Sequence, residues 1–191
     1  MSGHFQALPG GGAAVPLDEV EISILRSLAV QLLELIGPGD MPAKGEDPLA
    51  ELFREGPSEP PSDPALARLF PDAYGDGDDE LRAASAEFRR YTENDLRTRK
   101  REDALAVVRS LDALGAAGEG GAVLELTPDE ARRWLGALND LRLTIGTRLE
   151  VKDDDESEAL YRLPDSDPRK PMVMAYLWLG ALQETLVETL M

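Results

Sequence analysis

Three long segments of this chain repeat apolar residues at intervals of three and four, the spacing that lines one face of an α-helix. Two of them begin with a strong start signal, because Asp18 with Glu21 and Thr127 with Glu130 have the spacing of a capping box. The third, from Met172, is apolar over much of its circumference and is expected in a core or a subunit interface. The chain is therefore predicted to form helices over 18–36, 127–149 and 172–190.

A further helical stretch is predicted between residues 79 and 114. It forms either two helices, over 79–99 and 102–114, or one continuous helix. Apolar spacing in its first half marks the positions that are expected to be buried. These positions are Leu81, Ala84, Phe88, Tyr91 and Leu96.

Aspartates that stand immediately before prolines mark two short helices, because aspartate is a good N-cap and proline suits the first helical position. These helices are predicted over 49–54 and 65–70. Otherwise the segments 37–64 and 150–171 are expected to be irregular and rich in loops, with a short extended piece at 160–163.

The N-terminus is predicted to form a β-hairpin, with strands at His4–Leu8 and Ala13–Leu17 around a glycine-rich turn. Because an isolated two-stranded hairpin is only marginally stable in water, Ala122–Leu126 is a candidate third strand. The predicted fold is mainly α, a single helical domain over residues 1–191 with one core and a small N-terminal hairpin or sheet.

The composition excludes several kinds of chemistry. The chain has no cysteine, which rules out disulfides, thiol catalysis and cysteine redox switches, and its one histidine, His4, lies near the N-terminus. The acidic runs Asp76–Glu80 and Asp153–Glu158 are solvated turns or loops or, alternatively, cation sites. Because Leu81 stands where an EF-hand loop needs glycine, that motif is excluded. No catalytic residue, metal ligand or cofactor is predicted.

The net charge of −17 is concentrated at the two ends of the chain. Residues 1–80 carry 16 acids and 4 bases, residues 81–149 carry 11 and 12, and residues 150–191 carry 10 and 4. This charge favours protein partners and opposes direct binding to nucleic acid. Neither a membrane-spanning apolar run nor a signal peptide is apparent in the sequence, so a cytoplasmic location is expected.

Positive charge gathers in the middle of the chain, where Arg89 and Glu93 have a spacing that permits an ion pair on a helix. The cluster is either a salt-bridged helix surface or a docking surface for a partner. Arginines near the start of the 127–149 helix extend it. The candidate partner-binding residues are Arg89, Arg90, Arg97, Arg99, Lys100, Arg101, Arg132 and Arg133.

The 127–149 helix also has a core stripe and two polar residues that are mildly unfavourable inside a helix, Asn139 and Asp140. These two are expected to accept hydrogen bonds from an arginine such as Arg142 or from a nearby loop. The residues of the stripe are Ala131, Trp134, Leu135, Leu138, Leu141, Ile145 and Leu149.

Several phrases of the sequence resemble the actinobacterial domain of unknown function 2017, and the likeness covers nearly the whole chain. The phrase Leu138–Leu143 is its most specific part. The phrases are Arg68–Tyr74, Glu87–Glu93, Leu96–Lys100, Leu126–Ala131, Trp134–Leu143 and Gly146–Arg148. The resemblance implies a transcriptional regulator of oxidative stress that acts with a sigma factor. Redox sensing through a cysteine pair does not carry over to a chain without cysteine.

The sequence therefore favours a non-enzymatic cytoplasmic regulator that binds a protein partner, by resemblance a sigma factor or the transcription machinery. Two alternatives stay open: an enzyme that uses carboxylates or a metal, and a regulator that binds DNA directly. A homodimer through 172–190 and a central core helix both explain the apolar character of that segment.

Overall fold

The computed structural model describes residues 3–38, 55–75, 77–115, 121–151 and 160–191. It is mainly helical with a small antiparallel sheet, so the predicted fold class is confirmed. The short helix predicted at 49–54 lies outside the described residues. The elements in chain order are β1 (Gln6–Ala7), β2 (Ala13–Leu17), α1 (Glu19–Ile36), α3 (Pro64–Leu69), α4 (Asp79–Gly115), β3 (Ala122–Leu126), α5 (Pro128–Arg148) and α7 (Lys170–Leu190).

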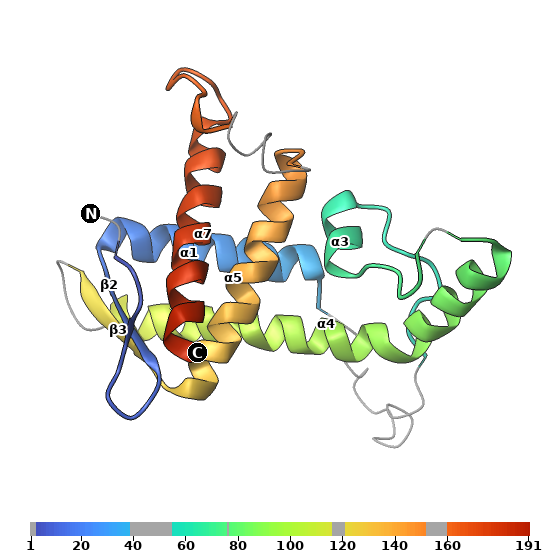
Figure 1. Cartoon of the computed structure of the whole chain (residues 1–191), viewed down its shortest axis with the longest axis horizontal. Helices are drawn as coiled ribbons and strands as arrows, with labels where there is room; N and C mark the ends of the chain where they lie inside the picture. The colour runs from blue at the N-terminus through green and yellow to red at the C-terminus, as the bar shows by residue number, and fades with distance from the viewer. Residues whose placement is uncertain (1–2, 39–54, 76, 116–120, 152–159) are drawn as a thin grey trace.

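The long helix α4 organises the molecule (Figure 1). It runs along the longest axis beside α1, while α5 and α7 run across both of them and pack on each other. The first third of α4 reaches past the end of α1, where α3 and the adjoining loop lie beside it (Figure 1). One hydrophobic core joins the helices to the sheet.

Capping residues fix three of these helices at the predicted positions. Asp18 and Thr127 both complete capping boxes, with Glu21 and Glu130 respectively. The side chain of Asp63 accepts hydrogen bonds from the first backbone amides of α3, at 2.8 and 3.2 Å. Each cap satisfies amides that a helix leaves without an internal partner.

The sheet has the order β1-β2-β3, with Val15 of β2 opposite Leu124 of β3. Both side chains are buried, and Phe5 before β1 meets Trp134 of α5 edge to face with ring centroids 6.1 Å apart. The indole Nε1 of Trp134 donates to Ser110 Oγ of α4 at 3.3 Å. The sheet therefore closes one end of the helical core.

Two details differ from the sequence-based expectations or sharpen them. The stretch 79–115 is one continuous helix. The extended piece predicted at 160–163 is wrong: Leu160 and Tyr161 are helical, and the Leu163 amide donates to the Leu160 carbonyl at 3.3 Å. Lys170 supports this turn, because its Nζ donates to the Leu163 carbonyl at 2.8 Å.

The last helix, α7, is a core helix that buries Val173, Leu179, Leu182 and Leu186. Its predicted role in a dimer stays a prediction. Among the described residues, none of the helices combines the length and the apolar character needed to cross a bilayer.

The turn between β1 and β2 offers a matched test of the sheet. Gly10 and Gly12 both have positive φ, but a Cβ on Gly12 would clash with the Leu126 carbonyl whereas a Cβ on Gly10 meets no atom within 4 Å. We expect Gly10→Ala to lower the free energy of unfolding by about 1 kcal/mol and Gly12→Ala by more than about 2 kcal/mol. Urea unfolding followed by circular dichroism measures both, and equal losses would contradict the packing of β2 on β3.

Candidate functional site

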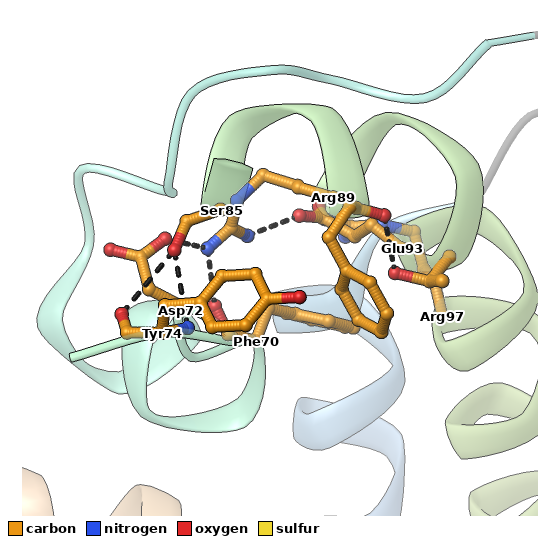
Figure 2. Close-up of polar contacts among 9 residues, drawn as sticks. Phe70, Asp72, Tyr74, Ser85, Arg89, Glu93 and Arg97 are labelled. Carbon is orange, nitrogen blue, oxygen red and sulfur yellow. Dashed lines mark hydrogen bonds and ion pairs between the residues drawn. The ribbon is translucent and has the colours of Figure 1, made fainter. Parts of the chain in front are cut away.

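Two residues of the basic cluster, Arg89 and Arg97, lie on the side of α4 that meets the end of α3 and of α1 (Figure 2). Arg89 is only 4% exposed and forms an ion pair with Glu93, which is 3% exposed. Its Nη2 donates to the Phe70 carbonyl at 3.0 Å and to Asp72 Oδ1 at 2.8 Å. Burial lowers the pKa of Arg89, but its bonds to Asp72 and Glu93 outweigh burial and raise it above the usual value. The guanidinium therefore stays charged inside the protein.

The Glu93 carboxylate is shared between two arginines. Its second oxygen accepts from Arg97 Nη2 at 2.7 Å. Arg97 also donates to the carbonyl of Ile36, the last residue of α1, and its guanidinium lies 4.4 Å from the centre of the Phe70 ring. These contacts join α1, α4 and the end of α3 into one polar cluster.

Two further basic residues fasten α4 to its neighbours. Arg101 donates to the carbonyls of Gly37 and Leu33 and so satisfies the C-terminus of α1. Lys100 Nζ donates to Asp140 Oδ1 of α5 at 2.6 Å. Asp140 therefore bonds to a lysine of α4, whereas the expected donor Arg142 bonds to Gln183 Oε1 of α7 at 2.6 Å.

A buried serine attaches the loop after α3. Ser85 Oγ accepts from the Tyr74 amide at 3.2 Å and donates to the Tyr74 carbonyl at 3.3 Å (Figure 2). Ser85, Arg89 and Glu93 follow one another at four-residue intervals, so they form a polar line along the buried side of the helix.

The predicted buried positions in the first half of α4 are wrong, because this polar line occupies the inner side. Ala84 is half-buried. The large apolar residues are partly exposed, by 42% (Leu81), 50% (Phe88), 62% (Tyr91) and 38% (Leu96). In α5, by contrast, the predicted stripe is buried except for Leu135, which is half-buried.

The other candidate partner-binding residues lie at the surface or near it. Arg90 pairs with Glu55 at 2.6 Å and is partly covered. Arg132 pairs with Asp129 at 2.5 Å, and Arg133 reaches Glu102 of α4 at 3.7 Å. Arg99 is exposed. The accessible members of the predicted set are therefore Arg99, Arg132 and Arg133.

The described part of the chain has two open grooves, and Arg133 lines one of them. One, of about 690 Å³, lies between α4 and α5; the other, of about 720 Å³, follows α7 beside Arg142 and Tyr176. Within the described ranges, no group of three or more His, Cys, Asp or Glu side chains is arranged to hold a metal ion. The two buried carboxylates, Glu93 and Asp140, line neither groove.

The Arg89–Glu93–Arg97 cluster predicts a large and specific cost of mutation. Arg89→Met leaves the buried Glu93 with one arginine fewer, and we expect it to lower the free energy of unfolding by about 3–5 kcal/mol. Arg82→Ala, at an exposed pair with Asp79, is the control and should cost less than about 1 kcal/mol. Denaturant unfolding compares the two variants. Similar small losses would show that the arginine is not buried.

Asp140 predicts a pH dependence. Burial raises the pKa of this carboxyl above 3.8, and the Lys100 ammonium opposes that rise. An acid whose pKa is higher in the folded state adds stability that is present below its unfolded pKa and is lost as pH rises through its folded pKa. The stability cost of Asp140→Asn, measured by urea unfolding, should therefore shrink as the pH is raised from about 4 towards 7. A cost that grows over this window would contradict the raised pKa.

Comparisons with known proteins agree with the sequence phrases. The model of the family described as domain of unknown function 2017 (DUF2017) matches residues 2–190. Proteins of Mycobacterium bovis and Mycobacterium tuberculosis, each named oxidative stress regulator AosR, are 33% identical over 182 residues, which cover 90% of this chain and 78% of each relative. No solved structure matches the chain significantly. The chain belongs to the DUF2017 family, together with relatives that are named regulators of oxidative stress.

Proposed function

We propose that this protein regulates transcription under oxidative stress in the cytoplasm by binding a sigma factor or RNA polymerase, and that it catalyses no reaction. The observation that carries the proposal is the 33% identity to relatives named oxidative stress regulators over 90% of the chain. A chain without cysteine cannot sense oxidants through a thiol of its own, so in this proposal the response reaches it through its expression or through a partner.

Charge supports a protein partner over DNA. The net charge of −17 repels a phosphate backbone, and four of the arginines and lysines of the basic cluster are engaged with α1, α3, α5 or the loop beside them. The cations left at the surface lie where α4 meets the start of α5, and they suit an acidic patch on a protein. In this proposal Arg132 and Arg133, on the first turns of α5, contact that patch.

Direct DNA binding by α4 and α5 as a helix-turn-helix is disfavoured, because β3 separates them and a tight turn does not join them. A carboxylate enzyme is disfavoured as well, because the most buried carboxylate is held by Lys100 and faces neither groove. A regulator that acts through protein contacts fits both observations.

Binding to purified mycobacterial RNA polymerase, with and without each sigma factor, tests the proposal. Biolayer interferometry should detect a complex that Arg132→Glu with Arg133→Glu weakens at least tenfold. Arg68→Glu with Arg82→Glu removes the same charge from exposed positions elsewhere and should leave binding unchanged. No binding to any of these proteins would refute the proposal. A complex with DNA alone that weakens steeply with salt would favour the alternative of a regulator that binds DNA directly.

A further inference from the structure

The first half of α4 carries three large apolar side chains that stay well exposed, although Gly77 lies against one of them, Leu81, and the Arg90 guanidinium lies 5.5 Å from the centre of the Tyr91 ring. Leu81, Phe88 and Tyr91 are each more than two-fifths exposed. Phe88 and Tyr91 lie away from the buried line of Ser85, Arg89 and Glu93, whereas Leu81, four residues before Ser85, lies at the edge of that line. Neighbouring large apolar side chains at the surface of a soluble protein mark an interaction site. Contact with an apolar surface of another molecule would bury these side chains.

The second half of the same helix has the complementary shape. Eighteen residues make five full turns of an α-helix, so Ala106 lies on the same side as Phe88, and Ala113 on the same side as Asp95. Ala106 and Ala113 line the groove between α4 and α5, together with Leu105 and Ser110. Large side chains thus project from the first half of one helix side, and a groove of about 690 Å³ lies on the second half. Small residues form part of its floor, and four charged residues also line it: Glu102, Arg109, Glu130 and Arg133.

Three complementary pairs on this side share one midpoint. In sequence number, the midpoint of each pair is residue 97. The pairs are Phe88 with Ala106, Leu81 with Ala113, and Asp95 with Arg99. A two-fold axis at that level turns the helix end for end and places the first member of each pair against the second member in the other copy. The projection of each chain then enters the groove of the other, about 27 Å from its own groove.

The charges agree with the same arrangement. Asp95 and Arg99 are both exposed, and neither forms an ion pair with another residue in the described part of the chain. Across the two-fold axis, Asp95 of each copy would face Arg99 of the other, which gives two pairs of opposite charge in the dimer. Glu87 and Arg109 are also exposed, and neither forms an ion pair among the residues described. Their midpoint in the sequence is residue 98, one residue from that of the other pairs. Residues 81–149 carry 12 bases and 11 acids, so this segment is nearly neutral and two copies of it do not repel each other strongly.

We propose that two copies of this chain associate through the outer face of α4, antiparallel and centred near residue 97, with each Phe88 in the α4–α5 groove of the other copy. The interface is isologous, so one patch serves both copies. It concerns the chain alone and does not rest on the proposed regulatory role. The proposed dimer contact is on α4, whereas the homodimer considered from the sequence is through 172–190, which is part of α7.

Sedimentation velocity over a concentration series tests the dimer. We expect the wild-type chain to dimerise and Phe88→Asp to weaken self-association at least tenfold, because the ring that fills the groove is replaced by a short, charged side chain. Met174→Asp, at a 54% exposed position of α7, is the matched control and should leave the dimer intact. A wild type that is monomeric at every concentration would overturn the proposal. So would a dimer that Met174→Asp dissociates and Phe88→Asp does not.

Charge exchange tests the register. Asp95→Arg and Arg99→Asp each place two like-charged pairs in a homodimer, so each variant should be monomeric where the wild type is dimeric. Mixing them creates a heterodimer in which both pairs are again opposite, and it should restore a one-to-one dimer. Circular dichroism confirms that both variants fold. Variants that dimerise alone as the wild type does, or a mixture that stays monomeric, would contradict the register.

Discussion

The carboxylate of Glu93, buried between Arg89 and Arg97, determines how the first half of α4 lies in the molecule. A buried charge is tolerated only when ions and hydrogen bonds surround it. Here Arg89 also donates to the carbonyl of Phe70, and Arg97 donates to the carbonyl of Ile36. The polar cluster therefore binds the ends of α3 and α1 as well. With the inner side of α4 committed to polar contacts, its apolar residues can only face outward.

Much of the fold follows from local sequence signals. The capping boxes at Asp18 and Thr127 and the core stripe of α5 lie where spacing and cap chemistry place them. These features depend on residues within a few positions of one another. Interactions between residues close in the sequence determine these features, so they can be predicted from the sequence.

The orientation of α4 and the role of its basic residues do not follow from local signals. Periodicity assigns Leu81, Phe88 and Tyr91 to the core, because a rule based on apolar spacing takes no account of a polar inner side. The signal that marks the true inner side is the four-residue spacing of Ser85, Arg89, Glu93 and Arg97, which is equally typical of a solvated helix. The bond between Lys100 and Asp140 joins residues 40 positions apart, so spacing gives no sign of it.

The burial of Arg89 is the central claim, and arginine modification of the native protein tests it most directly. With phenylglyoxal and mass spectrometry, Arg132, whose side chain is 67% exposed, should react readily, while Arg89, at 4%, should stay protected until the protein is unfolded. This result would confirm that the basic cluster supports the fold from inside. Reaction of Arg89 at the rate of Arg132 in the folded protein would show instead that the cluster faces solvent.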